Sequence, residues 1–309
     1  MKFYSHGKVL LTAEYAVLEG VKALSLPTKK GQSLTVEYNR NKTIEWQSYT
    51  DQNELWIDLT FDTAFNCIVI NKTSPEHIAS VQALLRAINE LVPGFYRDGL
   101  TLTTSLEFPR DWGLGSSSTL INNLGQWLEI NPYILLDKTM GGSGYDIAAA
   151  QNYSPIYYER NGYNPKVTPV AFSPAFKEQL FFVHLNQKQN SRTAISNYQK
   201  QGIIHSTIKD RLTVIGTEIT QTNDLAHFCS LLKEHEGITA SFLNQTPVQQ
   251  RLFSDFDGQI KSLGAWGGDF VLAAGNEPIK AYFQAKGFKT VIPYTAVSYT
   301  HLRAHETDS

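Results

Sequence analysis

The chain has 309 residues, of which 42% are hydrophobic, and this is enough apolar surface to form a buried core. At roughly 100 to 200 residues per domain, the length predicts two domains. The 27 Lys and Arg residues nearly balance the 29 Asp and Glu residues, and no run of like charge provides the footprint of a nucleic-acid or membrane-surface binder. We therefore expect a small molecule as the partner, with no nucleic acid and no membrane.

The cysteines and the apolar segments narrow the class further. Cys67 and Cys229 lie far apart, without a second thiol or a His at metal-ligand spacing, so they indicate buried free thiols rather than a disulfide or a zinc site. Polar residues interrupt the apolar ones at the N-terminus, and no later segment approaches the ~20 apolar residues of a membrane span. A cytoplasmic protein is expected.

The first half of the chain predicts a sheet and several helices. Residues 1–60 hold β-favouring segments between turn clusters (VLLTAEYAVL, SLTVEY, TIEWQSY, ELWIDLTF), which indicate a largely antiparallel sheet. Apolar residues at helical spacing predict an amphipathic helix over 74–91, opened by Ser-Pro and ended by Pro-Gly. A strand over 100–108 leads into a glycine–serine turn and a second helix. The glycine-rich turn at 141–144 precedes a short helix and a strand.

The second half continues as a mixture of strands and helices. Asn161 and Gly162 mark the expected domain boundary. We expect helices between about 193 and 233 and near 248–256, and strands at VTPVAF, QLFFVHL, FVLAA and TVIPY, with a helix at IKAYFQA. This is an α+β pattern. The last residues, 297–309, have no periodicity and are expected to be a frayed or non-native tail.

The glycine–serine turn GLGSSS, from Gly113 to Ser118, has the ingredients of an anion-binding cradle. Glycines let the backbone approach a phosphate, and the N-terminus of the following helix offers unpaired N–H groups and a positive dipole. Taken alone, the segment fits a serine-capped turn equally well. It matches neither the Walker P-loop, which needs a Lys after its last Gly, nor a Rossmann fingerprint.

Three other segments agree with this turn in order and in detail. They read GKVLLTAEYAVL from Gly7, GSGYDIAAA from Gly142 and SLGAWGGDF from Ser262. Together these segments resemble the motifs of the GHMP kinases, over the chain from Gly7 to about Ala274. The EYAV, GSGYDIAAA and GAWGGDF sequences resemble most the mevalonate and phosphomevalonate kinase branch.

This resemblance implies a fold and an activity. The fold is a two-domain α+β arrangement, with an ATP-binding domain like ribosomal protein S5 domain 2 over residues 1–162 and a ferredoxin-like domain over residues 163–296. The active site is expected between the two domains. The activity is transfer of the γ-phosphoryl group of ATP, with Mg²⁺, to an alcohol or phosphate acceptor. Mevalonate and phosphomevalonate, in isoprenoid precursor synthesis, are the first acceptors to consider, and a monomer or homodimer is expected.

The resemblance also implies catalytic residues. Asp146 matches the catalytic aspartate, which would orient or deprotonate the acceptor hydroxyl, although an Asp at a helix start is also stabilised by the helix dipole alone. Lys8 matches the lysine that pairs with that aspartate, keeps it ionised and offsets charge on the phosphoryl group. The alternative for Lys8 is a solvated lysine at a sheet edge.

The remaining site residues follow from the same motifs. Ser117 matches the position that contributes to Mg²⁺ and phosphate binding. The ATP-binding loop is completed by Gly113, Gly115, Ser116 and Ser118. Glu14 is expected to be either structural or near the substrate. Gly267 and Gly268 of the third motif are expected on the substrate side.

Two departures from the family pattern leave alternatives open. Trp266 stands where the third motif normally has a glycine, and no acidic Mg²⁺ ligand can be placed apart from the substitute Asp137. One alternative is therefore a nucleotide-binding pseudokinase with a regulatory role. Others are homoserine kinase, galactokinase and diphosphomevalonate decarboxylase activities.

Overall fold

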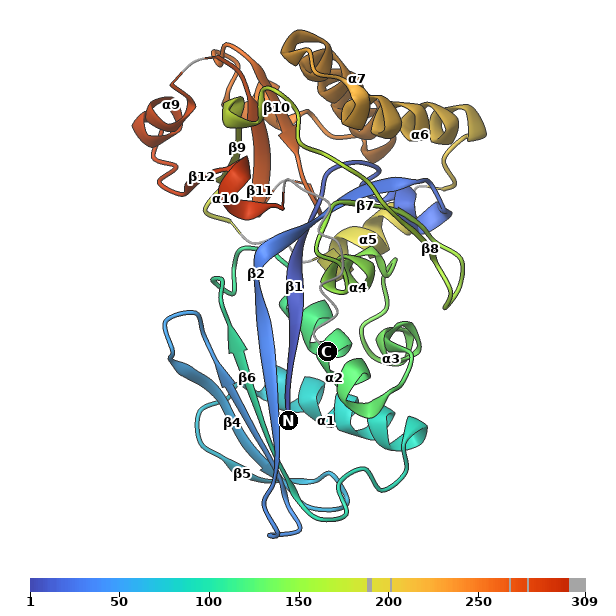
Figure 1. The fold of residues 1–309 in the computed structure, drawn as a ribbon, viewed down its shortest axis with the longest axis vertical. Helices are drawn as coiled ribbons and strands as arrows, with labels where there is room; N and C mark the ends of the chain where they lie inside the picture. Colours follow the sequence, from blue (N-terminus) through green and yellow to red (C-terminus); the bar gives the residue numbers. More distant parts are fainter. Residues whose placement is uncertain (188–190, 201, 267, 277, 300–309) are drawn as a thin grey trace, which may run out of the picture. The chain divides into compact units, whose positions relative to one another are not determined.

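The computed structural model describes the chain in two compact units (Figure 1). The described residues are 1–187, 191–200, 202–266, 268–276 and 278–299. Unit 1 consists of residues 1–7, 30–110 and 115–151, and unit 2 of residues 8–29, 111–114 and 152 onward. The predicted tail lies mostly outside the described residues. The units interleave along the chain, and the predicted domain division at residue 162 stays a prediction.

The described elements run in the following order. The strands are β1 (Lys2–Leu10), β2 (Ala23–Tyr38), β3 (Ile44–Tyr49), β4 (Leu55–Phe61), β5 (Cys67–Ile70), β6 (Leu100–Leu106), β7 (Ile156–Glu159), β8 (Lys166–Pro169), β9 (Leu180–His184), β10 (Gln259–Ser262), β11 (Phe270–Ala274) and β12 (Val291–Pro293). The helices are α1 (Pro75–Leu91), α2 (Ser116–Leu128), α3 (Pro132–Thr139), α4 (Tyr145–Ala150), α5 (Ser191–Gln199), α6 (Ser206–Gln221), α7 (Leu225–Leu243), α8 (Val248–Leu252), α9 (Ile279–Ala285) and α10 (Tyr294–Val297), with 3₁₀ turns η1 (Ala16–Glu19) and η2 (Lys177–Gln179).

The larger sheet contributes strands to both units. Over the described residues it has eight strands in the order β5-β4-β3-β6-β2-β7-β8, with β1 also paired to β2. Strand β2 pairs with β6 over Gln32–Tyr38, in unit 1, and with β7 over Ala23–Ser25, in unit 2. The β3–β6 pair is parallel and the other pairs described here are antiparallel. The largely antiparallel sheet expected for the first part of the chain is confirmed.

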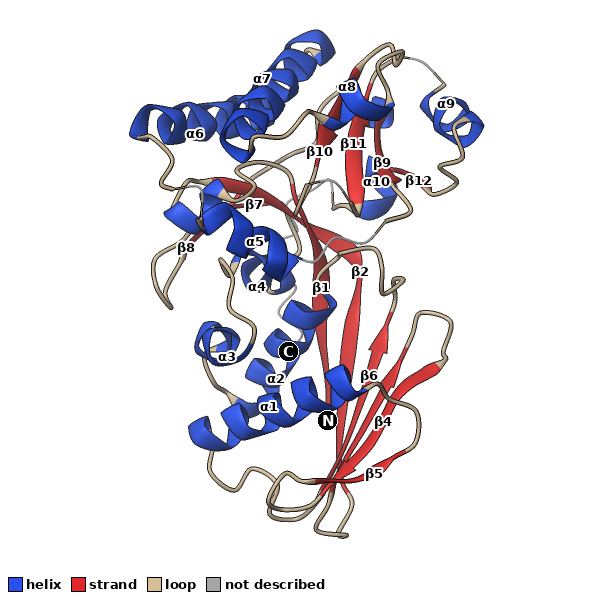
Figure 2. Cartoon of the chain, turned by 180° about the vertical axis from the view of Figure 1, so that it is seen from behind, coloured by secondary structure: helices blue, strands red, loops and turns tan. Residues whose placement is uncertain are grey.

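In unit 1, helices cover one face of this sheet. Figures 1 and 2 show α1, α2 and α3 on the same side of β4 and β6. Trp46 of β3, Leu102 of β6 and Leu85 of α1 are buried in the core between these layers. The helix predicted over 74–91 is confirmed as α1, with Ser74 as its N-cap residue and Pro75 in its first turn. This layer supports α2, which follows directly after the glycines of the serine turn.

Unit 2 is built around a smaller antiparallel sheet. Its order is β10-β11-β9-β12, and its core includes Phe253, Ile260 and Phe283. Helix α7 packs against β10, and α6 lies beside α7 (Figure 1). The predicted α+β class is confirmed.

Other expectations differ from the structure. The VLLTAEYAVL segment was expected to be extended, but the strand ends at Leu10 and the chain turns through Ala13 and Tyr15, both at φ 63°, into η1. Long-range contacts of this segment within unit 2 determine that turn. Helix α3 was not predicted, because it has only eight residues and little helical periodicity. The free cysteines are half-buried rather than fully buried. No helix within the described residues is long and apolar enough to span a membrane.

Candidate functional site

The serine turn opens helix α2, as predicted. Gly115 is the N-cap residue of α2 at φ 91°, and Gly113 lies at φ 64°. Both values are in the left-handed region, which glycine adopts without steric cost. Among the described residues, no side chain caps the helix at Gly115, and this geometry suits the binding of an anion by the N–H groups of the first turn.

The three serines of this turn have different environments. The Ser118 side chain is buried, and its Oγ donates to the Gly115 carbonyl at 2.9 Å. The next hydroxyl, Thr119 Oγ1, donates to Gln32 Oε1 at 2.6 Å. Ser116 is half-buried, whereas Ser117 is exposed. Ser117 and Ser118 were both predicted to bind ATP or its metal ion. The Ser117 hydroxyl lies at the surface, whereas the Ser118 hydroxyl stabilises the turn.

Lys8 contacts the chain that leads into this turn. Its Nζ donates to the Gly113 carbonyl at 2.8 Å, and its backbone N–H donates to the Leu114 carbonyl at 3.0 Å. The side chain is half-buried on β1. This geometry favours the predicted role near the phosphate loop over a freely solvated lysine.

Asp146 lies in the first turn of helix α4, in unit 1. The preceding Gly144 is the N-cap residue at φ 85°, and Asp146 Oδ1 accepts from the Ile147 N–H at 3.1 Å. The carboxylate is half-buried at the end of a Gly-Ser-Gly turn. Lys8 and Asp146 belong to different compact units, so their pairing stays a prediction.

The third motif forms the loop before β11 in unit 2. Trp266 takes φ 51°, the left-handed conformation for which a glycine is expected, and only 2% of its surface is exposed. Gly268 is buried, and Gly267 lies outside the described residues. Trp266 therefore keeps a glycine-like backbone, while its side chain is almost completely buried.

Asp269, which the motif analysis did not single out, packs on the first glycine of the turn. A Cβ atom at Gly113 would lie 2.5 Å from Asp269 Oδ2, so this position requires glycine. Asp269 itself is at φ 51°, and its backbone N–H donates to the Gln187 carbonyl at 2.8 Å. The contact joins residues far apart in sequence, and the only local signal is the acid that closes GGD.

Glu14 of the first motif is completely buried in unit 2. Its Oε1 accepts from Lys261 Nζ, and its Oε2 lies 3.7 Å from His235 Nε2. Burial raises the pKa of Glu14 to about 7, against the opposing effect of the Lys261 charge. Of the two roles left open for Glu14, this position favours the structural one.

Two neighbours of Glu14 on α7 were also missed from sequence. His235 Nε2 accepts from the Ala13 N–H at 2.8 Å, and burial together with the Lys261 charge holds the pKa of His235 well below its usual range. Glu236 accepts from the N–H and the Oγ of Ser262, at 3.1 and 2.7 Å, and its pKa is raised by burial. Both lie on the stripe of buried residues at helical spacing that runs from Phe228 to Leu243, and they were missed because the predicted helical region ended near residue 233.

The serine turn offers one exposed side-chain oxygen that suits a metal ion, the hydroxyl of Ser117. Among the described residues, no three His, Cys, Asp or Glu side chains come together as a metal site. Mg²⁺ commonly binds substrate phosphates with few protein oxygens, and the exposed Ser117 hydroxyl at the start of α2 fits that mode. Asp137 is exposed on α3, and its role as a substitute ligand stays a prediction.

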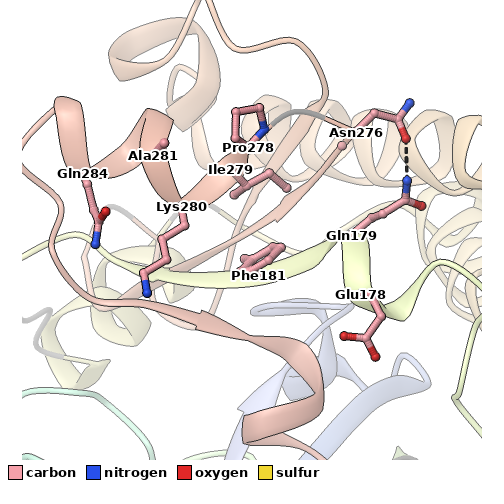
Figure 3. A pocket seen from close by; sticks show the side chains of 10 residues that line it. Glu178, Gln179, Phe181, Asn276, Pro278, Ile279, Lys280, Ala281 and Gln284 are labelled. Carbon is pink, nitrogen blue, oxygen red and sulfur yellow. Dashed lines mark hydrogen bonds between the residues drawn. The ribbon is translucent and has the colours of Figure 1, made fainter.

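A separate hollow lies on unit 2, beside α9. It has a volume of about 400 Å³ and is lined by Phe181, Lys280 and Glu178 among others (Figure 3). Gln179 Nε2 donates to Asn276 Oδ1 across its rim at 2.5 Å. The hollow is near the end of β11, whereas the third motif leads into the start of that strand. It is therefore distinct from the predicted site.

Comparison with solved structures identifies the fold. The similar structures are GHMP family kinases, so the chain has the fold that its motifs predicted, and the resemblance is confirmed at that level. Mevalonate kinase of Methanococcus jannaschii is 18% identical, with a TM-score of 0.67, over 94% of this chain and 96% of that one. Phosphomevalonate kinase of Streptococcus pneumoniae, in complex with phosphomevalonate and AMPPNP, is 14% identical, with a TM-score of 0.67, over 97% and 98%.

A third structure is similar over nearly its whole length. Galactokinase of Lactococcus lactis, complexed with galactose, is 13% identical, with a TM-score of 0.64, over 96% of this chain and 92% of that one. The sequence matches no protein-family model and no curated protein. The similar kinases thus act on several acceptors, and the likeness establishes the fold alone.

Proposed function

We propose that this protein is a GHMP-type kinase that transfers the γ-phosphoryl group of ATP to a small alcohol or phosphate acceptor. The observation that carries the proposal is the contact of Lys8 Nζ with the Gly113 carbonyl, at the entrance to the serine turn. It brings a cation to a backbone segment suited to phosphate binding. The fold shared with several kinases supports the same activity.

The turn and the lysine have complementary roles in this proposal. The first N–H groups of α2 bind phosphate oxygens, and the glycines at Gly113 and Gly115 let the backbone approach them. Lys8 offsets negative charge as the phosphoryl group moves. Mg²⁺, when bound, neutralises phosphate charge, and the Ser117 hydroxyl would contribute to holding it.

Asp146 is proposed to orient or deprotonate the acceptor hydroxyl. Its place after a glycine turn, at the first turn of α4, leaves the carboxylate half-buried. A positioned general base is worth typically about 10² to 10⁴-fold in rate. Gly267 and Gly268 are proposed to lie on the acceptor side.

Mevalonate and phosphomevalonate are the proposed acceptors, which would place the protein in cytoplasmic isoprenoid precursor synthesis. The first-motif sequence EYAV and the sequence GSGYDIAAA support this branch, and kinases for both acceptors share the fold. Galactose and a heptose phosphate are acceptors to compare, because kinases named for them also share it.

A coupled assay of ADP release tests the proposal. The purified chain is incubated with Mg-ATP and, in turn, with mevalonate, phosphomevalonate, homoserine, galactose and a heptose phosphate. We expect acceptor-dependent ADP release with one of the first two. ATP binding without release for every acceptor would contradict the kinase activity and favour the pseudokinase alternative.

A further inference from the structure

Four ionisable side chains form a buried cluster in unit 2. Glu14, Lys261 and His235 are 0% exposed and Glu236 is 2% exposed. They come from three segments: the loop after β1, strand β10 and helix α7. None of the four takes part in the proposed phosphoryl transfer.

Such a cluster is a costly way to fill a core. Taking a charge out of water costs several kcal/mol per ion, and apolar residues of similar volume are often as stabilising as a buried ion pair. Lys261 Nζ nevertheless donates to Glu14 Oε1 and, at 2.9 Å, to the Ser262 carbonyl. What the charged groups provide beyond burial is a fixed set of directed hydrogen bonds.

Those hydrogen bonds fix the first motif to the third. The Ala13 N–H donates to His235 Nε2 at 2.8 Å, and Tyr15 Oη donates to the Ala265 carbonyl at 2.8 Å. Glu14 lies between these two residues and contacts Lys261, which directly precedes the third-motif segment. Tyr15 thus joins the segment of residues 11–15 directly to the segment of residues 262–266. Ala13 joins the first segment to α7, whose Glu236 accepts hydrogen bonds from Ser262.

We propose that Lys261 is a positioning residue, which holds the first-motif segment 11–15 against the third-motif segment 262–266. The first segment directly follows the strand that carries Lys8, and the second directly precedes the glycines of the third motif. The expected effect of Lys261 on the catalytic rate rests on the proposed kinase function. Its expected effect on the position of the two segments does not depend on that function.

The charge on Glu14 affects how strongly Glu14 and Lys261 attract each other. Glu14 interacts with Lys261, His235, Glu236 and Tyr15, and its pKa of about 7 means that it changes charge near neutral pH. Protonation of Glu14 weakens its attraction to Lys261 while leaving the Ser262 carbonyl as a partner. The Glu14–Lys261 ion pair itself is therefore fully formed only above neutral pH, although ionising the buried carboxylate there lowers the net stability of the fold.

Hydrogen exchange followed by mass spectrometry tests the positioning directly, without any substrate. Lys261→Met should speed amide exchange in peptides covering 11–15 and 262–266 by about tenfold or more. Peptides covering 44–61 of unit 1 should be unchanged. The control is Lys166→Met, which breaks the exposed Lys166–Glu159 ion pair of the same unit and should leave all of these peptides unchanged.

A double variant separates positioning from charge balance. Glu14→Gln with Lys261→Met leaves no unpaired charge of that pair, so it should fold even where Lys261→Met alone does not. We expect it to keep the fast exchange and to lower kcat about tenfold, with the KM for ATP nearly unchanged. Restoration of slow exchange and of wild-type kcat in the double variant would overturn the proposal, because the cluster would then be structural filling.

The two proposals fail in different ways. A wild-type protein that phosphorylates no acceptor contradicts the kinase function, and the exchange experiment still decides the role of Lys261. Normal exchange in both segments of Lys261→Met contradicts the positioning role, whatever the kinase activity.

Discussion

The serine turn is held by backbone geometry, whereas the cluster around Lys261 is held by buried side chains. In the turn, left-handed glycines and one buried hydroxyl, that of Ser118, leave N–H groups and the Ser117 hydroxyl open. In the cluster, Lys261 and Glu14 are completely buried and directed at each other. The proposed phosphate-binding turn is thus built from small residues, whereas buried charges fix the loops of the cluster.

The largest expected effect concerns Asp146, the proposed catalytic carboxylate, which follows a left-handed glycine as the serines of the turn do. Asp146→Asn keeps the size of the side chain and removes its basicity. We expect kcat to fall by about 10² to 10⁴-fold while ATP affinity changes little, as measured by steady-state kinetics and nucleotide titration. Asp98→Asn, at an exposed carboxylate of the same unit, is the control. A kcat near that of the wild type would contradict the proposed catalytic role and leave Asp146 with a structural role at the start of α4.

The next effect belongs to the buried cluster and depends on pH. Glu14 has a folded pKa of about 7 and an ordinary value of 4.5, so the folded state binds its proton more tightly than the unfolded state does. Its stabilisation is therefore fully present below about pH 4.5 and is lost as the pH rises to about 7. Relative to Glu14→Gln, the free energy of unfolding of the wild type should fall by about 2 to 3 kcal/mol over that range.

Urea unfolding of both proteins between pH 4.5 and 8 measures this difference. Burial shifts the pKa of Glu236 in the same direction as that of Glu14, and shifts that of His235 in the opposite direction. Both residues are present in the wild type and in the variant, so their contributions largely cancel. A difference that does not change with pH would show that Glu14 does not titrate in this range.

A third change tests the backbone of the turn. Gly115→Val places a β-branched side chain at φ 91°, which strains the turn by about 1 to 3 kcal/mol and adds bulk where phosphates are proposed to bind. We expect ATP affinity to fall about tenfold or more, by calorimetric titration. Gly287→Val is the matched control, because Gly287 has φ 90° with open space around it, after α9. Equal ATP affinity in wild type and Gly115→Val would contradict the cradle.

The smallest effect separates two adjacent serines. Ser118→Ala removes a partly buried hydrogen bond to the Gly115 carbonyl and should cost about 1 kcal/mol of unfolding free energy. Ser117→Ala, at an exposed position, should change stability by less than about 0.5 kcal/mol but weaken the binding of Mg-ATP. Thermal unfolding and nucleotide titration of both variants give the comparison. A loss of stability in Ser117→Ala, together with weaker Mg-ATP binding in Ser118→Ala, would contradict these assignments.

Helix α1, the serine turn and the start of α4 could be predicted from the sequence, because their sequence signals are local. Apolar spacing between Ser74 and Leu91 predicted α1, and the glycines and serines from Gly113 to Ser118 predicted the turn before α2. The same holds for Asp146 at the start of α4. Each prediction uses residues within a few positions of one another.

The buried cluster around Lys261 could not be predicted from the sequence, because its contacts join segments that are distant along the chain. Lys261 in QIKS looks like an exposed strand residue, and nothing near it names Glu14 as its partner 247 positions away. The turn at Ala13 and Tyr15 was taken for strand for the same reason, since the hydrogen bonds to His235 and Ala265 set its direction. Asp269 against Gly113 is a further contact of this kind.

The proposed reaction is transfer of the γ-phosphoryl group of ATP to a small acceptor. Mass spectrometry of the acceptor, after incubation with Mg-ATP and either the wild type or Asp146→Asn, tests it most directly. We expect phosphorylated mevalonate or phosphomevalonate in amounts that match the ADP released by the wild type, and almost none with the variant. ADP release without a phosphorylated acceptor, or equal product from both proteins, would contradict it.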